Sequence, residues 1–155
     1  MGQRLQEDGI HVTETVTIWR PVTQVYAFWR DFSNLPQIMR HLERVDVLDE
    51  RHSHWVAKAP AGTTVEWDAE IVADRPDELI TWRSREGTGV ENAGAVHFNA
   101  LPGGQGSEVR VELQYNPPGG AVGAAVAKLF GEEPRQQVQE DLHRFKKMME
   151  NGKAI

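Results

Sequence analysis

Residues 116–150 read NPPGGAVGAAVAKLFGEEPRQQVQEDLHRFKKMME, and they are the strongest guide to the architecture of this chain. The Pro- and Gly-rich segment 116–120 is typical of a turn that ends a strand. Two helices are predicted after it, at about 121–130 and 134–150, with Gly131 and Pro134 between them. The longer helix carries an apolar stripe at helical spacing: Val138, Leu142, Phe145 and Met149. Such a helix needs an apolar surface to lie on, and a sheet is the large surface that the rest of the chain provides.

Alternation of apolar and polar residues predicts that sheet. The first strand is expected over 10–19, with Glu14 as the one polar break in its apolar row. A helix from Pro21 to about Phe32 follows, and then a short one that begins at Pro36 and is capped by Ser33 or Asn34. Six further strands are marked by apolar positions at Val45 and Val47, Trp55 and Ala57, residues 65–71, Ile80 and Trp82, Val96 and Phe98, and residues 109–115. Strands joined by short turns indicate an antiparallel meander, so the fold class is α+β.

Composition narrows the class of protein. The chain has 155 residues, which fits one domain, and we expect that domain to span 10–152 after a polar tail at 1–9. A net charge of −6 without a cluster of Lys and Arg argues against nucleic acid as a partner. The chain has no cysteine, which excludes disulfides and Cys-ligated zinc. The tail does not resemble a signal peptide and no apolar run is long enough to span a bilayer, so we expect a cytoplasmic protein without stable membrane insertion.

Three segments together resemble a known family. They are the RDFSNLP segment at 30–36, the TVEWDAE strand at 64–70, and the stretch from the PPGG turn at 117–120 to FGEEP at 130–134. All three are similar to the polyketide cyclase/dehydrase and coenzyme Q-binding branch of the START-like (SRPBCC) superfamily, over about 10–152. The resemblance implies the helix-grip fold, in which a curved antiparallel sheet of about seven strands wraps a long C-terminal helix and encloses an apolar cavity. Members of this superfamily include lipid and quinone binders, aromatic cyclases and ligand carriers, so the fold alone does not assign the function.

The tryptophans are the leading candidates for a ligand site. Trp55, Trp67 and Trp82 lie on three successive strands, each on the apolar side of its own alternation. Flat rings on a concave sheet face would bind a ring or an isoprenoid chain, although packing against the C-terminal helix alone would also explain them. The full set predicted to line a cavity is Trp55, Trp67, Trp82, Phe98, Val126, Phe130, Leu142 and Phe145.

The polar motifs are assigned to the surface. Glu66, Asp68 and Glu70 alternate with Trp67, so we expect them to form a cross-strand ion-pair ladder with Thr81, Arg83 and Arg85 on the next strand. Glu140 and Arg144 are predicted to pair across one turn of the last helix. His11, His41 and His143 are interpreted as surface residues, and His97 is expected to point outward.

Catalytic and metal sites are not predicted. His52 and His54 share a strand face as a metal pair could, but no third ligand stands at suitable spacing. The sequence has neither a nucleophile elbow nor a dinucleotide-binding glycine motif, so no cofactor is expected. The Gly-rich segments at 86–94 and 117–120 are interpreted as turns, with a mobile lid at a cavity mouth as the alternative.

These patterns predict a protein that binds an apolar small molecule, such as a lipid, a quinone or a polyketide-like aromatic, between the sheet and the last helix. The alternative is a cyclase or dehydrase that acts on a polyketide-like substrate in the same cavity. Two ionisable side chains in the pocket with strongly shifted pKa values would favour that enzyme. A third class is an interaction module with a collapsed cavity and an exposed apolar patch.

Overall fold

The computed structural model describes residues 10–58, 60–85, 91–116 and 134–151. The elements in chain order are β1 (Ile10–Ile18), α2 (Val22–Arg30), the 3₁₀ helix η1 (Phe32–Gln37), β2 (Leu42–Val47), β3 (His52–Lys58), the 3₁₀ turn η2 (Pro60–Gly62), β4 (Thr64–Arg75), β5 (Leu79–Ser84), β6 (Glu91–Ala100), β7 (Ser107–Asn116) and α4 (Pro134–Glu150). The predicted helix at 121–130 and most of the Gly-rich segment at 86–94 lie outside the described residues.

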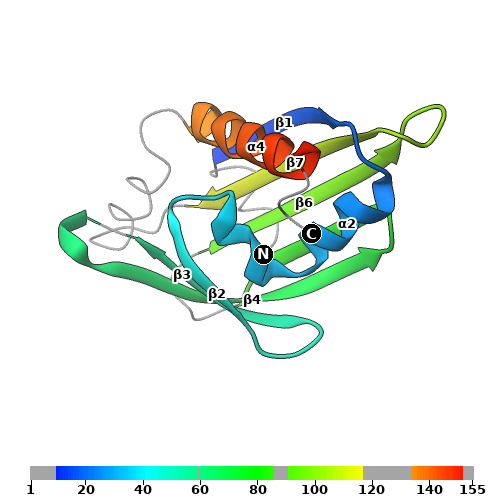
Figure 1. The fold of residues 1–155 in the computed structure, drawn as a ribbon. Coiled ribbons are helices and arrows are strands. Elements are labelled where there is room, and N and C mark those ends of the chain that lie inside the picture. Colours follow the sequence, from blue (N-terminus) through cyan, green and yellow to red (C-terminus); the bar gives the residue numbers. More distant parts are fainter. Residues whose placement is uncertain (1–9, 59, 86–90, 117–133, 152–155) are drawn as a thin grey trace.

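The seven strands form one antiparallel sheet in the order β1-β7-β6-β5-β4-β3-β2. Strands β2 to β7 follow one another as a meander, and β1 joins the far edge by pairing with β7. The sheet is curved, and α4 lies along β1 (Figure 1). Irregular register between Leu42 and Arg44 in β2, and between Ile71 and Ala73 in β4, marks bulges, which bend a strand. The predicted α+β helix-grip architecture is therefore confirmed.

The last helix has the bounds and the buried face that its sequence predicts. Val138, Leu142, Phe145 and Met149 are all buried. The polar break in β1 is explained by the same contact, because Glu14 accepts hydrogen bonds from Arg135 Nη1 and Gln139 Nε2 on α4, both at 3.1 Å. No helix in the described part of the chain combines the length and apolar character needed to cross a membrane.

The second short helix differs from the prediction. It begins at Phe32, before Pro36, and Pro36 lies inside it. The cap is Asp31, whose Oδ1 accepts from the backbone N–H of Ser33 at 3.0 Å, so neither Ser33 nor Asn34 caps the helix. The Asp31 carboxylate satisfies a free N–H at an earlier position, and this moves the start of the helix toward the N-terminus.

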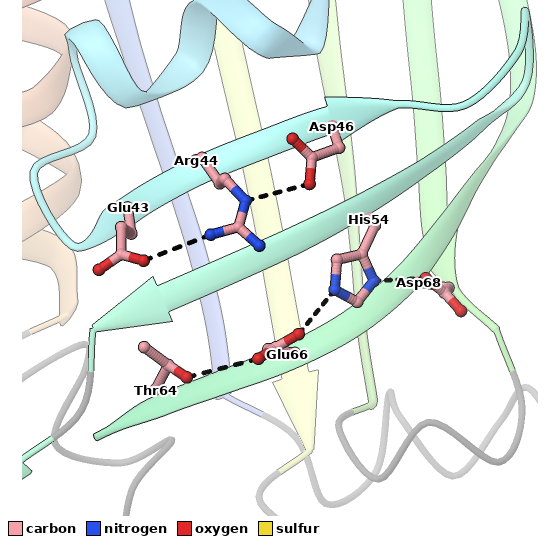
Figure 2. A network of polar contacts seen from close by, with 7 residues as sticks. All are labelled: Glu43, Arg44, Asp46, His54, Thr64, Glu66 and Asp68. Atoms are coloured by element: carbon pink, nitrogen blue, oxygen red, sulfur yellow. Dashed lines mark hydrogen bonds and ion pairs between the residues drawn. The ribbon is translucent and has the colours of Figure 1, made fainter.

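Two predicted ion-pair patterns are also corrected. Glu70 does pair with Arg83 (3.4 Å), but Glu66 and Asp68 pair with His54 on the other neighbouring strand. Figure 2 shows the His54 ring between these two carboxylates, with Nδ1 2.7 Å from Asp68 and Nε2 2.8 Å from Glu66. The register of β3 and β4 sets His54 opposite Asp68, and alternation along one strand does not contain that information.

On α4, the partner of Arg144 is Asp141 and not Glu140. Arg144 also donates from Nε to the backbone oxygen of Ile38. This second contact draws the guanidinium toward η1 and the buried side of the helix, where Asp141 lies and the exposed Glu140 does not.

Candidate functional site

Three tryptophan rings form a stacked row across the concave side of the sheet. Trp55 on β3 and Trp67 on β4 are directly opposite in register, and their ring centroids are 5.8 Å apart with planes inclined by 26°. Trp82 on β5 also stacks with Trp55, at 6.3 Å and 23°. The three rings are almost fully buried. The row therefore presents flat aromatic faces inside the protein and not to solvent, as the alternation predicts.

Neighbouring residues hold this row in place. Phe32 of η1 contacts Trp55 and Trp82 edge-on, with centroids at 5.5 and 5.3 Å. Gly94 on β6 lies directly opposite Trp82, and a Cβ atom at this position would come within 2.3 Å of the indole ring. A glycine is thus required for Trp82 to lie flat over β6.

A pocket of about 60 Å³ lies between these rings and the first half of α4. That volume is less than half of the roughly 150 Å³ of a cavity that binds benzene. Its apolar wall consists of Trp29, Ile38, Met39, Leu42, Trp55, Trp67, Trp82, Ala93, Val111, Leu113, Val138 and Leu142. Its polar lining consists of His41, Asn92, Gln114, Gln137 and Asp141. The site is thus mainly apolar with a small number of polar groups, as is common for small-molecule pockets.

Asp141 is the carboxyl group of this pocket, and it is 4% exposed. Burial raises the pKa of Asp141 to about 7, with the positive charge of Arg144 acting in the opposite direction. Arg144 donates from Nη2 to Asp141 and from Nε to the Ile38 carbonyl at 2.9 Å. The guanidinium thus ties α4 to η1 and is already engaged by protein acceptors.

His41 lies beside the same helix, in the connection between η1 and β2. Gln137 donates from Nε2 to His41 Nδ1 at 3.0 Å, which fixes Nδ1 as the unprotonated nitrogen. Burial, and then the charge of Arg144, lowers the pKa of His41 to about 4. His41 is therefore a neutral imidazole at physiological pH, and it is a half-buried residue of the pocket lining where a surface residue was expected.

Two indole N–H groups of the pocket wall are not hydrogen-bonded. The Nε1 atoms of Trp29 and Trp67 are buried and have no partner in the described part of the protein. Trp55 differs, because its Nε1 donates to Ser53 Oγ at 2.8 Å. An unpaired buried donor costs about 1–3 kcal/mol, so these two groups favour any arrangement that supplies an acceptor.

Residues 18–143 match the family described as polyketide cyclase / dehydrase and lipid transport. The chain belongs to this family. A protein from Streptomyces lincolnensis, described as an uncharacterized 17.2 kDa protein in the melC2-rnhH intergenic region, is 33% identical over 142 residues, which cover 90% of this chain and 89% of that protein. The family description agrees with the coarse prediction from the sequence, which is a hydrophobic ligand-binding or polyketide cyclase-type protein.

Solved structures agree with the family. DR_A0006 from Deinococcus radiodurans is 43% identical, with a TM-score of 0.75 over 92% of this chain and 99% of that chain. The Zhui aromatase/cyclase from Streptomyces sp. R1128 is 21% identical, with a TM-score of 0.61 over 94% and 92%. A START superfamily protein from Mycobacterium smegmatis is 13% identical, with a TM-score of 0.63 over 92% and 95%. At this identity the last two show a shared fold, and they support the START-like resemblance.

The residues predicted for ligand contact in this polyketide cyclase/dehydrase family member divide into three groups. Trp55, Trp67, Trp82 and Leu142 line the pocket. Phe98 and Phe145 are buried elsewhere, where Phe98 contacts Tyr26 and Phe145 contacts Phe28 and Trp29. Val126 and Phe130 lie outside the described residues.

The sequence interpretation missed the polar part of the lining. Asp141 lies three residues after Val138 and four before Phe145, which is the buried face of a wide helical stripe. This spacing could have indicated that Asp141 is buried, but a charged residue is normally expected on the exposed face of a helix. His41 and Trp29 carry no comparable signal, because His41 lies in a connection and Trp29 reads as an ordinary core residue of α2. The described residues contain no group of three His, Cys, Asp or Glu side chains that could hold a metal ion.

Proposed function

We propose that this protein binds a ring-containing apolar small molecule, such as a quinone or a polyketide-like aromatic, in the pocket between the indole row and α4. The observation that carries the proposal is the stacked row of Trp55, Trp67 and Trp82 beside a space that the core does not fill. Flat rings favour a flat ligand, because stacked aromatic pairs gain about 0.5–1.5 kcal/mol beyond the area they bury. A lipid chain would gain the area term alone.

The volume of the pocket sets the scale of the ligand. A cavity that binds one benzene measures about 150 Å³. The pocket of about 60 Å³ is smaller, so even a single aromatic ring requires the wall to repack around it. Aliphatic wall residues such as Leu142 and Met39 can move without breaking a side-chain hydrogen bond, whereas Trp55 is held by its bond to Ser53. We therefore expect binding to be accompanied by side-chain repacking.

The test is a calorimetric titration with 1,4-naphthoquinone, with native mass spectrometry of the protein as purified. Trp67→Ala should weaken binding at least about tenfold, because it removes one wall of the stack. Trp19→Ala is the matched control, since Trp19 is 57% exposed and is not among the residues that line the pocket. The proposal would be contradicted if the quinone binds more weakly than a Kd of about 1 mM and if the purified protein carries no bound molecule.

A second candidate function is acid–base conversion of a polyketide-like substrate in the same pocket. It is favoured by one observation: Asp141 and His41 both line the pocket, and both have strongly shifted pKa values. A carboxyl group with a pKa of about 7 can both accept and donate a proton at neutral pH. In a ring closure of the aldol type, Asp141 would take the proton from the carbon that attacks a ketone. The new C–C bond closes the ring as the ketone oxygen takes up a proton and becomes a hydroxyl, and later loss of this hydroxyl as water, with a proton from the neighbouring carbon, forms a C=C bond in the ring.

The enzyme and the binder are separated by Asp141→Asn. If the protein is a cyclase or dehydrase, the wild type converts a linear poly-β-ketone to a product that has lost one water, and the variant binds the substrate without converting it. If the wild type binds the substrate and releases it unchanged, the protein is a binder only.

A further inference from the structure

The polar groups that line the pocket indicate whether it binds neutral or negatively charged ligands more tightly. This inference rests on the proposed function, because it concerns what the same pocket accepts. Of the described residues that line the pocket, none is Lys or Arg, and Asp141 is the one carboxylate. The described part of the wall therefore offers a ligand no positively charged side chain.

The two cations that act on the charge of Asp141, Arg144 and the exposed Arg40, are not among the described residues that line the pocket. Arg144 is 24% exposed at its side chain, and its donors are engaged by Asp141 and by the backbone oxygen of Ile38. The other titratable group of the lining, His41, is held neutral and accepts from Gln137. A carboxylate that entered the pocket would lose its hydration without gaining a counter-charge, and such burial is strongly unfavourable.

Hydrogen-bond donors of the pocket wall would favour a neutral ligand that carries an oxygen atom. The indole N–H groups of Trp29 and Trp67 are buried and have no acceptor among the residues that the structure describes. A carbonyl or hydroxyl oxygen on the ligand would satisfy one of them as the side chains repack around the ring, and a pure hydrocarbon would not.

We infer that the pocket selects uncharged ring compounds that carry a carbonyl or hydroxyl oxygen, and that it discriminates against carboxylates, fatty acids among them. Asp141 and its engaged partner Arg144 are the specificity-determining residues against the anion. Trp29 and Trp67 are the two residues whose N–H groups would favour an oxygen-bearing ring over a bare one, and Trp67 is the one tested because it also belongs to the indole row.

The experiment uses three ligands that share one ring system: 2-naphthol, 2-naphthoate and naphthalene. Near pH 8 the phenol is neutral, and the carboxylic acid is ionised. In calorimetric titrations of the full chain, we expect 2-naphthol to bind at least about tenfold more tightly than 2-naphthoate. Equal or tighter binding of 2-naphthoate would overturn the inference while leaving the proposed function intact. Failure of all three ligands to bind the folded protein would overturn the proposed function, and the inference with it.

Two variants test the assignment to residues. Asp141→Asn frees the guanidinium of Arg144 to pair with the ligand, so the preference for 2-naphthol over 2-naphthoate should shrink several-fold, to below about threefold. Glu140→Gln is the matched control, because Glu140 is exposed on the same turn and should leave the ratio unchanged. An unchanged ratio in Asp141→Asn would overturn the role of Asp141.

Trp67→Phe keeps an aromatic ring and removes the N–H. It should reduce the preference for 2-naphthol over naphthalene. Trp55→Phe is the matched control, since it removes an N–H that is already paired with Ser53, and it should weaken both ligands in proportion. The same preference in Trp67→Phe as in the wild type would overturn the role of Trp67.

Discussion

The two ends of α4 pack against the same sheet in different ways. At the closed end, which consists of Phe145, Met149 and their neighbours, Phe145 contacts Phe28 and Trp29 at centroid distances of 5.1 and 5.6 Å. Phe145 and Met149 are fully buried there. At the pocket end, which consists of Val138, Asp141 and Leu142, the helix faces the indole row across a space of about 60 Å³. The apolar stripe is continuous along both ends, so the stripe itself does not determine where the core is filled.

The two ends of α4 differ because different side chains face the helix at each end. At the closed end, aromatic rings of α2 reach the helix and fill the space. At the pocket end, Trp55 stacks with Trp67 and Trp82, and Phe32 contacts Trp55 and Trp82 edge-on, so part of the apolar surface of these rings is buried without the helix. Because the indole rings pack on one another, the space between them and α4 can stay unfilled. A carboxyl group, that of Asp141, can then be buried beside this space.

The largest expected effect is a truncation at the closed end. Phe145→Ala should lower the free energy of unfolding by about 3–5 kcal/mol, because it leaves a cavity in a filled core. Leu142→Ala at the pocket end should cost less, about 2–3 kcal/mol, since part of its surface already faces the pocket. Urea denaturation measures both, and Lys147→Ala on the exposed face should stay within about 0.5 kcal/mol of the wild type. A larger cost for Leu142→Ala than for Phe145→Ala would remove the distinction between the two ends.

The pH dependence of stability tests the buried carboxyl group of the pocket end. Burial raises the pKa of Asp141 from 3.8 to about 7, so the folded protein holds this proton more tightly than the unfolded chain does. The stabilisation is present below about pH 4 and is lost as the pH rises through about 7. The wild type should therefore lose about 1–3 kcal/mol more than Asp141→Asn between roughly pH 5 and pH 8.

The same comparison has two internal controls. His41 is present in both proteins, so its own titration cancels in the difference. Glu140→Gln changes an exposed carboxyl group on the same turn and should track the wild type at every pH. Parallel pH profiles for the wild type and Asp141→Asn would show that Asp141 titrates as an exposed group and that the pocket end is hydrated.

The smallest effect is expected on the outer face of the sheet, where charge is paired in water. Hydrogen bonds from Asp68 and Glu66 raise the pKa of His54. This stabilisation is present below pH 6.5, the ordinary value, and is lost as the pH rises through the raised pKa. His54→Gln should thus destabilise the protein near pH 6 by less than about 1 kcal/mol and have no effect near pH 9. His143→Gln is the control, and an effect of His54→Gln that grows with pH would reverse the assignment.

The features that could be predicted from the sequence are those determined within a single helix or strand. The bounds and buried face of α4, the strand order and the inward direction of three indoles follow from period and turn residues within each segment. The resemblance to START-like proteins then supplied the way in which helix and sheet combine. Four of the residues predicted for ligand contact, Trp55, Trp67, Trp82 and Leu142, were found on the pocket wall for this reason.

The predictions that were wrong concern contacts between two different helices or strands. The pairing of His54 with Asp68 requires the register of β3 against β4, and the capture of Arg144 by Asp141 requires the approach of η1 to α4. Phe98 and Phe145 were expected at the pocket because they are apolar and inward, but inward residues at the closed end meet other aromatic rings. Burial is predictable from alternation, whereas the position of an unfilled space depends on how facing side chains satisfy one another.

The most direct test of the central claim is a site-resolved titration of the five indole N–H signals by NMR with 2-naphthol. The account predicts saturable shifts for the four tryptophans of the pocket wall, Trp29, Trp55, Trp67 and Trp82, and no shift for the exposed Trp19. Saturable shifts confined to Trp19, or unchanged signals for all four wall residues at saturating ligand, would contradict it.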